Sequence, residues 1–208
     1  LMVGLVLFGY GIALMVEAGL GLGPWEALNH GIAIQTVHQI DTISVLLGVP
    51  ILALWWPLGE RPGIGTLLNV VTIGTATNLG IALVPTPAMD PVPAAIAVRV
   101  VTMLAGLAVI AIGSALYLST DLGPGPRDGL MTGLHHRFGW SIRRSRTVVE
   151  LVVLGIGWAL GGTVGLGTVV FALGIGPLVQ VALGVVDPEG RMGRRRRARM
   201  AAEEPVGE

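Results

Sequence analysis

A glycine- and proline-rich motif occurs twice in this chain and constrains its fold more than any other feature. The first copy reads GLGPWEAL at residues 21–28, and the second reads GPGPRDGL at residues 123–130. Glycine, glycine, proline, an acidic residue and leucine stand at the same places, 102 residues apart. The same spacing relates PGIGT at 62–66 to VGLGT at 164–168. The sequence therefore predicts an internal duplication.

The composition indicates where such a duplicated unit lies. Apolar residues make up 52% of the chain and charged residues only 12%. Stretches of about 20 residues with few or no charges recur, and this is the length at which an α-helix crosses hydrocarbon. The sequence therefore predicts an all-α, polytopic membrane helix bundle. The absence of cysteine excludes disulfides, thiol catalysis and zinc sites of the cysteine type.

The repeat units are predicted at residues 1–84 and 95–186, with a proline-rich linker at 85–94 and a basic cytoplasmic tail at 187–208 that is expected to be disordered. The predicted spans cover about residues 1–16, 42–58, 63–84, 95–118, 147–160 and 165–186, and two short motif helices cover 24–40 and 126–140. Because the chain opens inside an apolar run, its natural N-terminus is expected further upstream.

The distribution of arginine favours a topology with six crossings. If both termini are cytoplasmic, every arginine except Arg99 lies on the inner side, as the positive-inside rule requires. Eight crossings satisfy charge counting almost as well. The motif helices would then expose Asp128 or Arg137 to lipid, at a cost of about 2.5–3.5 kcal/mol each. We therefore expect these helices to be re-entrant or interfacial.

A repeat unit with three spans has a functional consequence. Its second copy must enter the membrane upside down, so the repeat is expected to be inverted. Inverted repeats whose broken helices point their N-termini toward the midplane are typical of secondary transporters. A glycine-rich turn before a helix also exposes backbone amides, which carry a partial positive charge suited to an anion.

Several segments resemble one family of bacterial integral membrane proteins. These are GYGIALMVEAGLGLGPWEALNHG, RPGIGTLLN, DLGPGPRDGLMTGL and GGTVGLGTVVFALGIGPLVQ. They are similar to the YczE/YyaS/YitT family, most closely to its YczE-like branch, over roughly residues 4–186. The resemblance implies a multi-pass protein of the bacterial cytoplasmic membrane. The resemblance implies a role in transport and identifies no catalytic or binding residue, so none is carried over.

The candidate substrate-binding residues are Gly21, Gly23, Pro24, Glu26, Asn69, Asn78, Gly123, Gly125, Pro126, Asp128 and Gln180. Two interpretations stay open for each group. Glu26 and Asp128 are either a pseudo-symmetric carboxylate pair for protons or a cation, or acids that complement a helix dipole. The glycines and prolines either line a substrate site or form tight, closely packed turns. The amides either touch substrate or make interhelical hydrogen bonds.

Other polar residues have simpler interpretations. Arg146 and Glu150 are four residues apart, which predicts an intrahelical pair near the membrane face. His135 and His136 point about 100° apart on a helix, so no metal site is expected, and no cofactor. Residues 194–197 are all arginine and favour anionic lipid or serve only as a topology signal.

Three function classes remain from the sequence. A secondary transporter or channel for a small solute is favoured, and a non-transporting membrane protein that assists a neighbouring enzyme is the alternative. An enzyme is not expected because no Ser/His/Asp set, HExxH motif or paired carboxylates appear. Without a Walker motif the protein is not expected to hydrolyse ATP. The expected partners are the lipid bilayer and a small solute, and nucleic acid is not among them.

Overall fold

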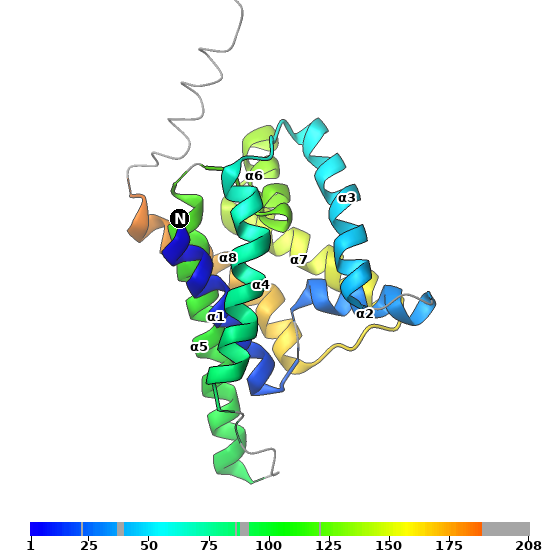
Figure 1. Cartoon of the computed structure of the whole chain (residues 1–208), viewed down its shortest axis with the longest axis vertical. Coiled ribbons are helices and arrows are strands. Elements are labelled where there is room, and N and C mark those ends of the chain that lie inside the picture. Colours follow the sequence, from blue (N-terminus) through cyan, green and yellow to red (C-terminus); the bar gives the residue numbers. More distant parts are fainter. Residues whose placement is uncertain (22, 37–39, 86, 88–91, 121, 189–208) are drawn as a thin grey trace, which may run out of the picture.

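A computed structural model describes residues 1–21, 23–36, 40–85, 87, 92–120 and 122–188, without the side chains of residues 40–42, 44 and 45. The described residues form eight α-helices and no strand (Figure 1). In chain order these are α1 (Met2–Ala18), α2 (Pro24–Gln35), α3 (Ile40–Leu58), α4 (Ile64–Leu83), α5 (Pro93–Leu118), α6 (Pro126–Phe138), α7 (Ile142–Ala159) and α8 (Leu166–Val186). The prediction of an all-α chain is confirmed for these residues.

Length and composition suit three helices to cross a membrane: α4 with 20 residues, α5 with 26 and α8 with 21. Two shorter apolar stretches, Met2–Ala18 and Leu46–Leu58, lie in α1 and α3. Large apolar side chains are exposed on several helices, for example Trp56, Leu67 and Val185. A surface of this kind suits lipid rather than water. The chain is therefore a multi-helix membrane protein, while the predicted number of six crossings stays a prediction.

The two motif helices are too short to cross a bilayer unaided. α2 has 12 residues and α6 has 13. At about 1.5 Å per residue they reach about 18–20 Å, against about 30 Å of hydrocarbon. Each ends before its predicted boundary. The backbone turns extended at Thr36, and Gly139 closes α6 in the left-handed conformation (φ 68°).

Helix α7 begins five residues before the predicted start of its span. Its N-cap is Ser141, whose side chain accepts a hydrogen bond from the backbone amide of Arg144 at 3.2 Å. A serine in this position satisfies one of the amides that a helix start leaves free. Arg146 is therefore a residue of α7, and its side chain is buried.

Helices α1 and α5 run in opposite directions and contact each other at glycine residues. In Figure 1, α1 runs from the labelled N-terminus downward and α5 runs upward. A Cβ atom at Gly4 would lie 2.8 Å from the carbonyl oxygen of Gly113, and one at Gly11 would lie 2.8 Å from that of Gly106. No other residue fits at these points without moving a backbone. The contact is a small-residue crossing, which lets two helices approach closely in a membrane.

The core has two parts, and the motif helices contribute to both. Helices α1, α5 and α8 supply most of the larger cluster, with Ile110, Ile175 and Val179 at its centre and Met131 of α6 against it. A smaller cluster joins α2, α3 and α7 through Trp25, Leu28, Ile51 and Val153. The apolar sides of α2 and α6 are thus covered by protein.

Helices α3 and α7 correspond to each other in the predicted repeat but pack differently. α7 lies along α8, where a Cβ at Gly176 would be 2.7 Å from the carbonyl oxygen of Arg143. α3 packs against α6 and α2 instead, and within the described part of the chain it makes no comparable contact with α4. A Cβ at Gly74 of α4 would have no atom within 4 Å. Figure 1 shows α3 apart from α4.

Candidate functional site

Each motif turn is bound by the start of a long helix from the other half of the chain. The amide of Gly167 donates to the carbonyl oxygen of Leu20 at 2.8 Å, beside the first turn. The amide of Gly65 donates to the carbonyl oxygen of Leu122 at 2.7 Å, beside the second. The two bonds are related by the spacing of 102 residues. The motif turns are therefore fixed by packing between the halves.

Gly21 and Gly123 need their glycine character for both conformation and space. Their φ angles are 133° and 106°, which L side chains rarely adopt. A Cβ at Gly21 would lie 3.0 Å from the Cα of Gly165, and one at Gly123 would lie 3.0 Å from the Cα of Gly63. Of the two interpretations offered for these glycines, the contacts favour the tight, closely packed turn.

The next glycines, Gly23 and Gly125, are the N-caps of α2 and α6, and Pro24 and Pro126 follow at the first helical position. A Cβ at Gly23 would lie 2.6 Å from a carboxylate oxygen of Glu26. The carboxylate of Glu26 therefore lies beside the N-terminus of its own helix, α2.

Asn69 lies directly against the second turn. A Cβ at Gly125 would lie 2.6 Å from its carboxamide carbon. The Asn69 side chain is buried, and its Nδ2 has no hydrogen-bond partner in the described part of the chain. Of the three amides predicted for the site, this is the one that reaches a motif turn.

Four side chains form a buried cluster beside α6: Tyr117 of α5, Asp128 of α6, and Arg146 and Glu150 of α7. The hydroxyl of Tyr117 donates to Oδ2 of Asp128, and Nη1 of Arg146 donates to Oδ1 of the same carboxylate at 2.5 Å. Nε of Arg146 lies 3.7 Å from Oε1 of Glu150. Asp128, Arg146 and Glu150 are 7%, 4% and 4% exposed. These ion pairs and hydrogen bonds therefore form a network that is buried inside the protein.

A second ion pair joins the two motif helices. Nη1 of Arg127 in α6 donates to Oε1 of Glu26 in α2 at 2.7 Å. The Arg127 guanidinium also lies over the ring of Trp25, 5.3 Å from its centroid. The Glu26 and Arg127 side chains are 35% and 37% exposed. We call Glu26 and Arg127 the bridging pair, because they connect the starts of α2 and α6.

The charges of the site do not balance. With ordinary ionisation, Arg127 and Arg146 supply two positive charges, and Glu26, Asp128 and Glu150 supply three negative ones. The bridging pair and the contact between Arg146 and Asp128 account for two of each. Glu150 is left as the excess anion, and its Oε2 is buried without a hydrogen-bond partner among the residues that the structure describes. Burying such a group costs several kcal/mol unless something compensates it.

Two of the predicted site residues lie elsewhere. Asn78 of α4 is exposed, nine residues beyond Asn69. Gln180 of α8 is exposed too, and its side-chain oxygen accepts a hydrogen bond from the amide of Arg143 at 3.1 Å. It therefore caps α7. Within the described part of the chain neither residue forms a hydrogen bond with the buried cluster, and their role in binding substrate stays a prediction.

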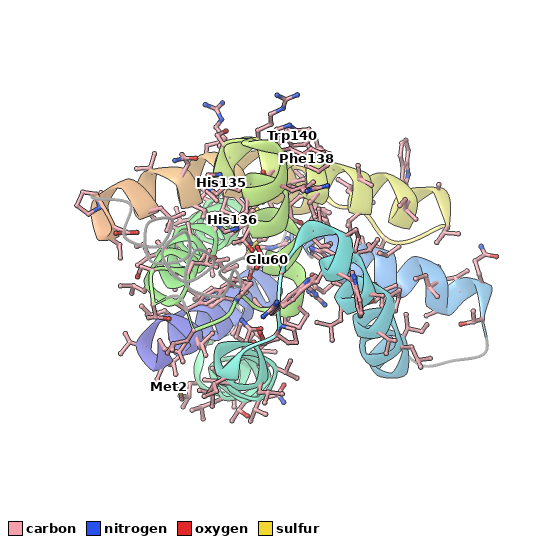
Figure 2. All side chains as sticks on the ribbon, turned by 90° about the horizontal axis from the view of Figure 1, so that it is seen from above. Met2, Glu60, His135, His136, Phe138 and Trp140 are labelled. Atoms are coloured by element: carbon pink, nitrogen blue, oxygen red, sulfur yellow. The ribbon has the colours of Figure 1, made fainter. Side chains whose placement is uncertain are left out.

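Three of the four histidines have partners outside the site. The amide of Thr163 donates to Nδ1 of His30 at 3.1 Å. His135 bonds the carbonyl oxygen of Trp140 at 2.6 Å, and His136 bonds Glu60 at 3.0 Å. Figure 2 shows His135, His136 and Glu60 at the C-terminal end of α6. His38 lies outside the described residues, within which no group of three or more His, Asp or Glu could hold a metal ion.

An apolar groove of about 380 Å³ lies between α1 and α4. Its lining includes Met2, Val6, Tyr10 and Leu79, and none of the described residues of either motif turn. Met2 is labelled at the edge of the molecule in Figure 2. The groove is therefore separate from the buried cluster.

The family described as "Family of unknown function (DUF6198)" matches residues 1–183. The chain belongs to this family. Over 186 residues it is 44% identical to an uncharacterized protein of Haemophilus influenzae, covering 89% of this chain and 83% of the relative. The predicted resemblance is thereby supported over residues 1–183.

Two further relatives of this DUF6198 family member come from Bacillus subtilis. The chain is 31% identical to the uncharacterized membrane protein YczE over 183 residues, covering 86% of this chain and 82% of YczE. It is 26% identical to the uncharacterized protein YyaS over 186 residues, covering 89% of this chain and 91% of YyaS. No solved structure matches. The predicted family resemblance is confirmed, and the relationship to YczE supports the assignment as a membrane protein.

Sequence reasoning missed part of the site in this DUF6198 family member. The sequence singles out neither Tyr117 nor Arg127, and it predicts Arg146 and Glu150 as a pair near the membrane face. The pair exists, but it is buried, and the shorter contact of Arg146 is with Asp128. The available signal was the rule that ionisable residues inside membrane segments need partners. For Glu150 this rule points to Asp128 and Arg127 of the second motif, and to Arg146 on its own helix.

Proposed function

We propose that this protein is a secondary transporter or channel for a small solute in the bacterial cytoplasmic membrane, and not an enzyme. The observation that carries the proposal is the buried cluster of Tyr117, Asp128, Arg146 and Glu150 beside the start of a short, broken helix. Ionisable groups inside membrane proteins are expensive and usually mark the path of a substrate or ion.

We propose further that the chain is an inverted repeat of residues 1–84 and 95–186. In a two-fold arrangement, residue i of one unit contacts j of the other, and j contacts i. The crossing of α1 and α5 follows this rule, because Gly4 corresponds to Gly106 and Gly11 to Gly113 in the 102-residue spacing. Gly4 lies against Gly113 and Gly11 against Gly106. The opposite directions of α1 and α5 in Figure 1 support units of opposite orientation.

The cluster is not required by the repeated fold itself. In the same spacing, Ser44 corresponds to Arg146 and Gly48 to Glu150. The first half therefore supplies the corresponding helix without either charge. A feature that one repeat contains and the other lacks is better explained by function than by packing.

The charges favour an uncharged or cationic solute over an anion. A free helix N-terminus attracts anions. Here Glu26 occupies the start of α2, and Asp128 lies in the first turn of α6. Both motif helices thus carry their own anion, and the site retains one further carboxylate. An anionic solute would add charge to a site that is already negative.

Uptake into liposomes tests the proposal. The purified protein is reconstituted and offered radiolabelled amino acids, monosaccharides, a quaternary ammonium ion and orthophosphate. We expect saturable uptake of an uncharged or cationic compound, which Asp128→Asn lowers at least tenfold. Glu17→Gln removes another buried carboxylate, outside the cluster, and serves as the matched control. Absence of uptake for every compound class would favour the accessory role instead.

A further inference from the structure

We propose that the Glu150 carboxylate is the site at which this protein binds a proton, and that this proton is the coupling ion of the transport cycle. The second half of this inference rests on the proposed function. The first half rests on the geometry of the buried cluster alone. The two halves are therefore tested separately.

Glu150 is the least compensated member of the cluster. Its Oε1 is 3.7 Å from Nε of Arg146, which is beyond hydrogen-bond distance, and its Oε2 has no partner in the described part of the chain. Arg146 is engaged by Asp128 at 2.5 Å, and Asp128 also accepts a bond from Tyr117. Among these groups, Glu150 therefore gains most from a proton.

The charged groups that act on Glu150 come from three helices. α6 contributes Asp128 and Arg127, α2 contributes Glu26, and α7 itself contributes Arg146. α8, which also packs on α7, contains no titratable side chain. The other ionisable groups of α2 and α6 include the histidines bonded to Thr163, Trp140 and Glu60. Two cations thus act on Glu150 together with two carboxylates that they already pair.

Protonation of Glu150 changes how the Arg146 guanidinium is shared between the carboxylates of Asp128 and Glu150. The proton comes from water, adds to a carboxylate oxygen and returns to water, and no other bond is made or broken. When Glu150 is neutral, Arg146 is held by Asp128 alone. When Glu150 is charged, it competes for the same guanidinium and weakens the contact between α6 and α7. Proton binding is thereby linked to the position of a motif helix.

Carbodiimide labelling tests the site on the unmodified protein. Dicyclohexylcarbodiimide reacts with protonated carboxyl groups in apolar surroundings, and mass spectrometry identifies the labelled residue. We expect Glu150 to be labelled, with the yield falling by about tenfold per pH unit above its midpoint. Labelling that is independent of pH, that falls on other carboxylates, or that sodium ions suppress would overturn the proposal.

Infrared difference spectra between acidic and basic pH provide a second measurement in detergent. We expect a carboxylic acid band in the wild type that is lost in Glu150→Gln and retained in Glu17→Gln. A band that survives in Glu150→Gln would contradict the site. If Glu150→Gln fails to fold, the labelling of the wild type still decides.

The transport half is tested in liposomes that contain a pH-sensitive dye. For a solute found to be taken up, we expect its addition to acidify the lumen with the wild type and at least tenfold more slowly with Glu150→Gln. Uptake without acidification overturns coupling but not proton binding. Proton binding at Glu150 without uptake of any solute overturns the proposed function and leaves the site.

Discussion

The guanidinium of Arg146 lies 2.5 Å from the carboxylate of Asp128, with both side chains buried. The pair joins α7 to α6, and so holds the second motif helix against the long helix that follows it. An ion pair of this kind is costly to break from one side, because the remaining charge is then buried without compensation. Removing one partner and removing both should therefore change the free energy of unfolding by different amounts.

Arg146→Met is expected to destabilise the protein by about 3–5 kcal/mol, since Asp128 and Glu150 lose their cation. The double variant Asp128→Asn with Arg146→Met removes one of these carboxylates too, and we expect it to recover part of the loss. Thermal unfolding in detergent, followed by tryptophan fluorescence, measures both. Additive losses in the double variant would show that the two residues do not interact.

The crossing of α1 and α5 gives a prediction with an internal control. Gly113→Ala places a Cβ 2.7 Å from the carbonyl oxygen of Gly4, so the helices must separate. We expect a loss of about 1–3 kcal/mol, typical of overpacking. Gly155→Ala lies in α7 with no atom within 4 Å of the new Cβ. It should be neutral, or stabilising by up to about 1 kcal/mol from helix propensity. Equal effects would contradict the close crossing.

The sequence predicted the local structure better than the site. The helix starts at Pro24 and Pro126 followed from glycine, proline and an acid in the first turn, and the boundaries of α4, α5 and α8 lie within two residues of the predicted spans. These features are encoded locally, by caps and by runs of apolar residues. The buried cluster depends on how α7 packs against α6. Spacing relates Arg146 to Glu150 on one helix, but no spacing rule relates Arg146 to Asp128.

The proposed inversion predicts opposite accessibility for a matched pair of residues. Gln35 and Arg137 correspond in the repeat and are both exposed at the ends of the motif helices. Single cysteines at these positions stand in a background without cysteine. A membrane-impermeant thiol reagent added outside intact cells should label Gln35→Cys, and should label Arg137→Cys only after the membrane is opened. Labelling of both from one side would indicate parallel repeats and would overturn the proposed inversion.

The difference between the two halves predicts a second conformation. α7 lies along α8, whereas α3 lies apart from α4. If the units exchange these arrangements, as inverted-repeat transporters do, then α3 should close on α4 while α7 separates from α8. The described structure would be one of two related states.

Paired cysteines can detect this exchange. A Cβ at Gly176 would touch Oγ1 of Thr147, so the two positions face each other between α8 and α7. The same Cβ would lie 2.7 Å from the carbonyl oxygen of Arg143, so a cysteine at position 176 requires a small shift of the helices before a disulfide to position 147 forms. Val45 and Gly74 correspond to them in the first half. We expect the Thr147/Gly176 pair to cross-link readily, and the Val45/Gly74 pair to cross-link more slowly, through the other state. Solute or a change of pH should shift the two yields in opposite directions, because one population grows only as the other falls. A Val45/Gly74 pair that never cross-links, with the other pair fully linked under every condition, would mean that the asymmetry is a fixed feature of the fold rather than a step in a cycle.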